Sequence, residues 1–112
     1  MPAKYHMHLH PEPFEMVAKG TKTIEMRIND EKRRLLKIGD TIEFESRTNP
    51  EKKVVVEIIS LPVFKSFKDA FSAFPPAAYG GASAEEYEKM YRYYPQEEEE
   101  KYGVVAIQFK LL

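Results

Sequence analysis

Residues 20–28 of the chain read GTKTIEMRI, and the rest of the sequence is interpreted outward from this stretch. Apolar and polar side chains alternate along it, which predicts a β-strand over residues 21–28, because successive strand side chains point to opposite faces. One face is expected to meet the core and the other to lie away from it; the two sets are Ile24, Met26 and Ile28, and Thr23, Glu25 and Arg27. Gly20 is placed to end a preceding helix.

The residues before this stretch predict a strand and then a short helix. Residues 4–9 alternate in the same way, and the two faces hold Tyr5, Met7 and Leu9 on one side and His6, His8 and His10 on the other. The run Pro11-Glu12-Pro13 suits the first turn of a helix. The side chains that then share the spacing of a buried stripe are Phe14, Val17 and Ala18.

The residues after the stretch predict three more strands and two helices. The run 54–59 is the most β-branched of the chain and is expected to be central in a sheet. The runs 66–69 and 83–86 each resemble a capping box, which marks the start of a helix. In chain order we expect a polar connection over 29–37 and then strands over 41–47 and 53–61, joined by a turn at 48–51. A helix with apolar residues at 67, 70, 71 and 74 follows, then a loop over 75–82 and a helix with apolar residues at 87, 90, 91 and 94. The chain closes with an acidic turn over 95–101 and a strand over 104–112.

These elements favour one domain over residues 1–112 with an α+β fold, because no internal repeat or linker divides the chain. About five strands with small helices between them suggest a curled, mixed, barrel-like sheet. An open α/β sheet is the alternative. No glycine-rich phosphate loop follows any strand, which counts against a doubly wound nucleotide fold.

The composition bounds the classes of function. The chain has 112 residues, 17 Lys+Arg against 18 Asp+Glu, a net charge of −1 and no Cys. Disulfide partners, cysteine-bound metals and thiol catalysis are therefore excluded. No apolar run reaches the roughly 18 residues of a membrane span, and the N-terminus lacks the apolar segment of a signal peptide, so we expect a cytoplasmic protein with no membrane partner. Basic residues gather over 19–37 and acidic ones over 85–100, which fits either one local basic site or charges spread over solvated faces.

The first candidate site lies within the opening stretch. Glu25 and Arg27 share a strand face and can pair with each other or address a ligand. Lys22 lies close by, and an amine beside a carboxylate can do acid–base or nucleophilic work when it is removed from water. The competing interpretation is an exposed ion pair on a strand, which spacing alone favours.

Two further groups of residues are candidates for ligand contacts. The side chains of His6, His8 and His10 share a strand face, where neighbouring histidines can chelate a metal with help from Glu12 or Glu15. Alternate strand residues lie about 6–7 Å apart, which strains a three-histidine site, so polar or stacking groups are favoured and no metal is predicted. Among the tyrosines, Tyr79 and Tyr93 are candidates for base stacking, whereas the helical spacing of Tyr87, Tyr91 and Tyr94 predicts core positions.

Several motifs together resemble a known family. They are His10-Pro11-x-Pro13-Phe14, the run from Gly20 to Arg27, Lys37-Ile38-Gly39-Asp40-Thr41-Ile42-Glu43-Phe44 and the tail over residues 94–107. In order and spacing this set resembles the ASCH (ASC-1 homology) domain of the PUA-like superfamily, in its small stand-alone bacterial and archaeal form.

The resemblance implies a PUA-like β-barrel of about five to six strands, with short helices flanking a cleft. It implies a domain that binds RNA or a nucleotide in RNA metabolism, without a cofactor. The ligand-binding residues it implies are Lys22, Thr23, Glu25 and Arg27 along the cleft, with His10 and Phe14 at its rim. The ligand's identity and the oligomeric state stay open.

Two alternatives accompany this interpretation. One branch of the family removes the acetyl group from N4-acetylcytidine, and other members cleave RNA; Lys22 matches the catalytic lysine of the first branch. The position of its catalytic threonine is Glu25 here, so a hydrolase of this type would use Lys22 and Glu25. Whether the chain is an enzyme is left open. The third hypothesis is a role in partner binding through the acidic segment over residues 85–100.

Overall fold

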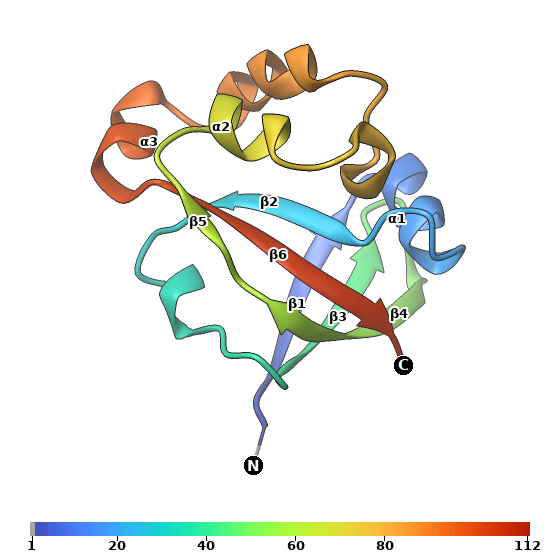
Figure 1. Ribbon diagram of the computed structural model, residues 1–112. Coiled ribbons are helices and arrows are strands. Elements are labelled where there is room, and N and C mark those ends of the chain that lie inside the picture. Colours follow the sequence, from blue (N-terminus) through green and yellow to red (C-terminus); the bar gives the residue numbers. More distant parts are fainter. Residues whose placement is uncertain (1) are drawn as a thin grey trace.

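The computed structural model describes residues 2–112, so Met1, the first residue of the predicted domain, lies outside the described residues. A curled sheet carries the short helices of residues 67–92 on one side (Figure 1). In chain order the elements are β1 (Lys4–Leu9), α1 (Pro11–Ala18), β2 (Ile24–Ile28), the 3-10 helix η1 (Arg33–Leu35), β3 (Thr41–Ser46), β4 (Asn49–Ser60), β5 (Val63–Phe64), α2 (Phe67–Ser72), the 3-10 helices η2 (Pro76–Tyr79) and η3 (Ala84–Arg92), α3 (Gln96–Tyr102) and β6 (Val104–Leu111).

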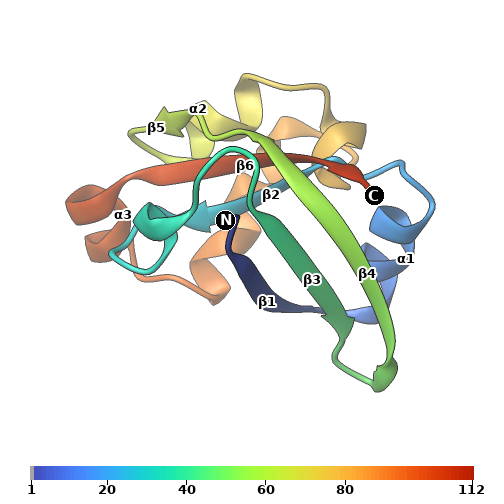
Figure 2. The same ribbon diagram turned by 90° about the horizontal axis from the view of Figure 1, so that it is seen from below.

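The sheet has the strand order β1-β3-β4-β6-β2, with β5 added beside β6. Only the β1–β3 pair is parallel among the described strands, and the other neighbours are antiparallel. Figure 2 shows how the sheet bends into a half-barrel, from which the β3–β4 hairpin projects. The prediction of a barrel-like α+β fold is confirmed. β1 and β2 are the two ends of the strand order, so a seam is left between them.

The β-branched run is central, as predicted, because β4 lies between β3 and β6. The predicted turn over residues 48–51 is too long and too late, and the strand predicted from residue 53 begins four residues earlier. Ser46 already pairs with Asn49, so the turn consists of Arg47 and Thr48, and β4 begins at Asn49. Pro50 therefore lies inside the strand, next to an irregularity in the β3–β4 register, which is a position where a sheet tolerates proline.

Two hydrophobic clusters cover opposite faces of the sheet. The inner cluster, within the half-barrel, consists of Leu9, Phe14, Val17, Leu36, Ile42, Phe44, Val56, Ile58, Val105, Ile107 and Phe109. The outer cluster, between the sheet and the later helices, consists of Ile24, Met26, Ile28, Phe67, Ala70, Phe71, Tyr79, Val104 and Ala106. β6 contributes to both clusters with alternate residues. The neighbouring β2 is consequently covered on both of its faces.

The helices follow their sequence signals in part. Ser66 caps α2, since its Oγ accepts a hydrogen bond from the Asp69 amide at 3.1 Å. Ser83 makes no side-chain cap, and the predicted second helix is the 3-10 helix η3. The Glu86 amide, which a capping hydroxyl would bind, donates to the Ser83 carbonyl instead at 3.2 Å. Ala18, predicted in the buried stripe of α1, is exposed. No helix among residues 2–112 has the length and apolar character needed to cross a membrane.

Candidate functional site

The charged face of β2 points into the half-barrel. In the β2–β6 register Glu25 lies opposite Ile107 and Arg27 opposite Val105, and both of these β6 residues belong to the inner cluster. The Glu25 and Arg27 side chains are only 11% and 16% exposed. The sequence correctly separates this face from the apolar one, but the interpretation as an exposed pair outside the core is wrong. The reason is that both faces of β2 are covered.

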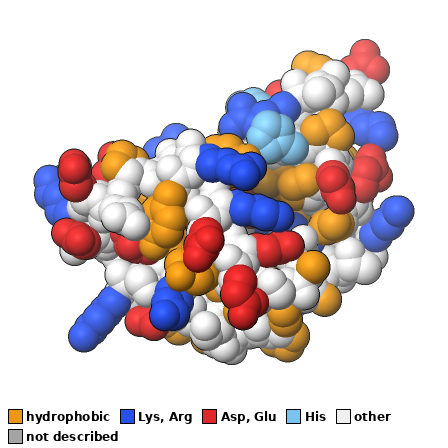
Figure 3. All heavy atoms as spheres, turned by 90° about the horizontal axis from the view of Figure 1, so that it is seen from above, with side chains coloured by type: hydrophobic (Ala, Val, Ile, Leu, Met, Phe, Trp, Pro, Cys, Tyr) orange, Lys and Arg blue, Asp and Glu red, His pale blue; other side chains and the backbone are white. Residues whose placement is uncertain are grey.

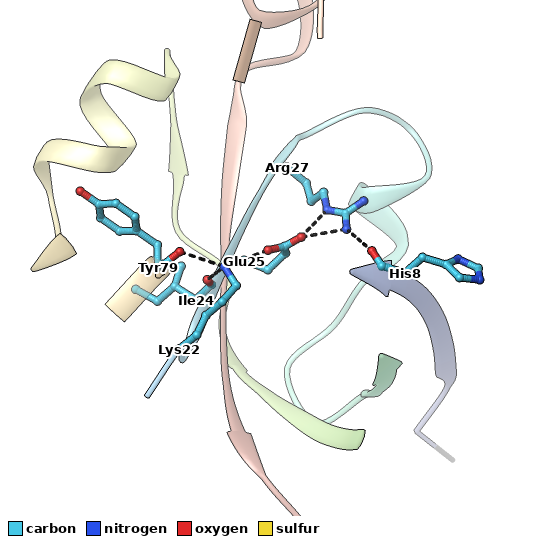
Figure 4. A network of polar contacts seen from close by, with 6 residues as sticks. All are labelled: His8, Lys22, Ile24, Glu25, Arg27 and Tyr79. Atoms are coloured by element: carbon cyan, nitrogen blue, oxygen red, sulfur yellow. Dashed lines mark hydrogen bonds and ion pairs between the residues drawn. The ribbon is translucent and has the colours of Figure 1, made fainter. Parts of the chain in front are cut away.

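Lys22, just before β2, is buried with its ammonium group in contact with three acceptors (Figure 4). Its Nζ donates to the Ile24 carbonyl at 2.8 Å and to the Tyr79 carbonyl at 3.0 Å, and it lies 3.0 Å from Glu25 Oε1. An ammonium group has three N–H donors. Each of them has a partner, so Lys22 serves as a fixed cation that ties β2 to η2.

Glu25 is the centre of this network. Its Oε1 faces Lys22, while its Oε2 accepts a hydrogen bond from Arg27 Nε at 2.8 Å and forms an ion pair with Arg27 Nη2, also at 2.8 Å. Burial by itself raises the pKa of the carboxyl group. The positive charges of Lys22 and Arg27 outweigh that effect, and the pKa of Glu25 is held below its usual value. Glu25 is therefore a buried carboxylate, stabilised by a cation on each side.

Arg27 is the outermost member of the network. Burial acts to lower its pKa, but the charge of Glu25 and the phenol of Tyr94 beside it raise the pKa of Arg27 above its usual value. Its Nη2 also reaches the His8 carbonyl across the seam, at the long distance of 3.5 Å. Two cations and one anion leave the network with one net positive charge. The arrangement presents an oriented guanidinium at the seam between β1 and β2.

Figure 3 shows the molecule from above, with several Lys or Arg side chains and a His side chain next to hydrophobic side chains. Much of the predicted basic stretch is engaged elsewhere: Arg33 pairs with Asp30 at 3.1 Å, and Arg34 Nε donates to the Asn29 carbonyl at 2.8 Å. The positive charge of the site thus comes from the network and not from the whole basic run.

The remaining predicted residues divide into two groups. His10 and Thr23 are exposed, and the Thr23 backbone is bonded to Ala78 and Phe109 on either side. Phe14, expected at the rim of a cleft, is 4% exposed and belongs to the inner cluster, because its helix packs that face into the half-barrel. Tyr79, a stacking candidate, is also buried, with its hydroxyl donating to the Phe71 carbonyl at 3.0 Å.

The histidines of β1 pair with acidic residues of β3. His6 Nδ1 lies 3.2 Å from Glu43 Oε1, and His8 Nε2 lies 3.2 Å from Glu45 Oε2. Within residues 2–112 no group of three or more His, Asp or Glu side chains is placed to hold a metal ion. The three histidines do not converge, since the fully extended strand keeps them apart.

Two contributors to the network were missed from the sequence. The Tyr79 carbonyl binds Lys22 from 57 residues away, and the neighbouring Gly80 leaves room for that lysine. A Cβ at Gly80 would come within 3.3 Å of Lys22 Cδ, and the residue has a φ of +82° that favours glycine. The two glycines at 80 and 81 signal a loop, but nothing in the sequence indicates which side chain that loop meets.

Known proteins share both the sequence pattern and the fold. A family model of the ASCH domain matches residues 7–112. The crystal structure of hypothetical protein PH0355 is similar with a TM-score of 0.84 at 36% sequence identity, covering 97% of this chain and 99% of that one. The solution structure of protein PF0455 from Pyrococcus furiosus has a TM-score of 0.76 at 36% identity, covering 97% of both chains.

More distant structures share the fold alone. ASCH from Zymomonas mobilis has a TM-score of 0.69 at 13% identity, over 94% of this chain and 65% of that one. Comparison with curated proteins finds no match. The family match over nearly the whole sequence, together with the relatives at 36% identity, shows that this chain belongs to the ASCH domain family, as its motifs predict.

Proposed function

We propose that this ASCH domain binds RNA or a nucleotide, in cytoplasmic RNA metabolism, with Arg27 as the residue that contacts ligand phosphate. The ASCH domain is a PUA-like family generally linked to RNA binding. The observation that carries the proposal is the guanidinium of Arg27, held by a hydrogen bond and an ion pair to Glu25 and directed to the seam. A guanidinium fixed in this way is pre-organised for a two-pronged contact with a phosphate.

The contacts of Arg27 leave it able to accept a ligand. The bond to the His8 carbonyl is long, so a phosphate oxygen can replace it at little cost. The network carries one net positive charge, while the chain as a whole has a net charge of −1. Recognition would thus depend on a few phosphates at one place, and not on a broad basic surface.

The geometry supports the hydrolase alternative less well. A nucleophile or general base needs a free lone pair, whereas Lys22 Nζ is surrounded by three acceptors. Both carboxylate oxygens of Glu25 are also engaged. We expect no release of acetate from N4-acetylcytidine by the folded protein, and turnover that disappears in Lys22→Ala would restore the hydrolase interpretation.

The binding proposal is tested with labelled single-stranded RNA and fluorescence anisotropy. Arg27→Ala removes a charged contact worth about 1.5–3 kcal/mol, so we expect affinity to fall by more than about tenfold. Arg27→Lys cannot reproduce the paired bonds to Glu25 and should also bind weakly. The matched control is Arg47→Ala in the exposed β3–β4 turn, which should bind like the wild type.

Unfolding of each variant is followed by circular dichroism, so that only folded samples are compared. Equal affinities for Arg27→Ala and Arg47→Ala, both matching the wild type, would show that β2 carries no phosphate site. Affinity that does not fall with added salt would point to the same conclusion, because phosphate contacts release counterions.

A further inference from the structure

Two exposed aromatic rings from distant parts of the chain lie next to each other. His10 precedes α1 and Tyr93 follows η3, yet their ring centroids are 6.5 Å apart with an interplanar angle of 43°. Tyr93 is 63% exposed. Aromatic pairs in folded proteins commonly have centroids about 4.5–7 Å apart, so this is a true contact between rings that remain open to solvent.

The other rings near this position have structural roles. Tyr91 donates to Glu99, and Tyr94 stacks on the buried ring of Phe67 at 5.7 Å. Both pack against the outer cluster. Tyr93 does not belong to either hydrophobic cluster among the described residues, and its exposed ring contributes little to the core. An exposed tyrosine held beside a histidine is available for a ligand.

Residues one or two positions from each ring contact Arg27. His10 follows His8 by two residues, about 6–7 Å along an extended chain, and the His8 carbonyl meets Arg27 Nη2. On the other side, Tyr93 adjoins Tyr94, whose phenol lies beside the Arg27 guanidinium. A base on the rings and its phosphate on Arg27 can therefore belong to the same or neighbouring nucleotides.

We propose that Tyr93, together with His10, forms a stacking site for one unpaired base of single-stranded RNA, next to the phosphate contact at Arg27. This inference rests on the proposed function, which it extends from phosphate binding to a preference for unpaired bases. Bases within a duplex are stacked on each other and cannot reach the rings, whereas those of a single strand can be splayed out. Every base offers a flat face, so little sequence preference is expected.

The experiment measures the affinity of the full chain for labelled oligoadenylate RNA and for its duplex with oligouridylate. The wild type should bind the single strand at least about tenfold more tightly, since stacking on an aromatic ring contributes about 1–3 kcal/mol per base. Tyr93→Ala should weaken binding to the single strand by about tenfold and leave the duplex unchanged. Tyr93→Phe should stay within about twofold of the wild type, because it keeps the ring.

The controls separate this inference from the proposed function. Ile38→Ala removes a side chain that is 68% exposed, outside both hydrophobic clusters, and should bind like the wild type. Arg27→Ala should weaken binding to the single strand and the duplex alike. If Arg27→Ala weakens binding while Tyr93→Ala does not, or if the wild type does not prefer the single strand, the stacking site is refuted and the phosphate site stands. If no RNA binds, both are refuted.

Discussion

Two glutamates in this protein are buried to nearly the same extent but are stabilised in different ways. Counted as whole residues, Glu25 is 9% exposed and Glu99 is 8% exposed. Glu25 lies between the cations of Lys22 and Arg27. Glu99 instead accepts hydrogen bonds from neutral donors, the Phe67 amide at 2.8 Å and the Tyr91 hydroxyl at 3.0 and 2.9 Å.

The difference shows how the partner of a buried carboxylate sets its role. Glu99 joins α3 to α2 and η3, and its acceptor capacity is used inside the protein. Glu25 forms its ion pairs with residues within or just before β2, and it leaves a net positive charge and an oriented guanidinium at the seam. Burial alone would mark both residues as candidate active-site acids, and only the charge of the partners distinguishes the candidate binding site from the structural one.

The largest expected effect comes from replacing each carboxylate by the isosteric amide. Glu25→Gln leaves two buried cations without a counter-charge, which should lower the free energy of unfolding by about 3–5 kcal/mol. In Glu99→Gln the amide oxygen can still accept from Phe67 and Tyr91, so the loss should stay below about 1.5 kcal/mol. Urea unfolding measures both, and equal losses would show that the cations around Glu25 do not matter for stability.

An intermediate effect is expected from Lys22→Met, which keeps an apolar stem of similar length. The carbonyls of Ile24 and Tyr79 lose a buried partner, while Arg27 still neutralises Glu25. The expected loss is roughly 2 kcal/mol in thermal or urea unfolding. Lys19→Met, an exposed lysine nearby, is the control and should be close to neutral. A loss as large as that of Glu25→Gln would mean that Lys22 alone compensates the carboxylate.

The smallest effects are expected in the pH dependence of stability. The Glu25 site should respond at acidic pH and the Glu99 site at alkaline pH. The folded protein holds the pKa of Glu25 below its usual value of 4.5, so this contribution is present above that pH and is lost as the pH falls through the folded pKa. The half-buried residues Glu15 and Glu43 also have lowered pKa values because of Lys52 and Lys4. The informative measurement is therefore the difference in the free energy of unfolding between the wild type and Glu25→Gln as a function of pH. This difference should shrink as the pH falls.

At the alkaline end the Glu99 site should respond instead. Burial and the hydrogen bond to Glu99 raise the pKa of Tyr91 from 10.0 to about 12. The contribution of Tyr91 to the free energy of unfolding is therefore present below pH 10.0 and is lost as the pH rises toward about 12. Tyr91→Phe should reduce this alkaline loss, with Tyr79, whose pKa is also raised by burial, providing the remainder. An unchanged alkaline profile in Tyr91→Phe would contradict the assignment.

Much of the fold was predictable from local patterns, whereas the site was predictable only in its residues. The alternation over residues 21–28 correctly identifies β2 and its two faces, although the strand begins only at Ile24 and not at the predicted Thr21. It cannot indicate that the charged face is covered as well, because the inner cluster of the half-barrel is built from residues distant in sequence. Lys22 illustrates the same limit: its residue type suggested chemistry, but its three acceptors, one of them 57 residues away, make it a structural cation.

The pairing of β2 with β6 also sets a time order for synthesis. Ile28 and Val104 are partners, and a ribosome makes them 76 residues apart (104 − 28), an interval of roughly 4–15 s at about 5–20 residues per second. Through that interval the nascent chain holds β2 without its partner strand, with an open edge that can pair wrongly. The inner cluster beside Arg27 includes Val105 and Ile107 of β6, so the half-barrel around the site is complete only after synthesis reaches this strand.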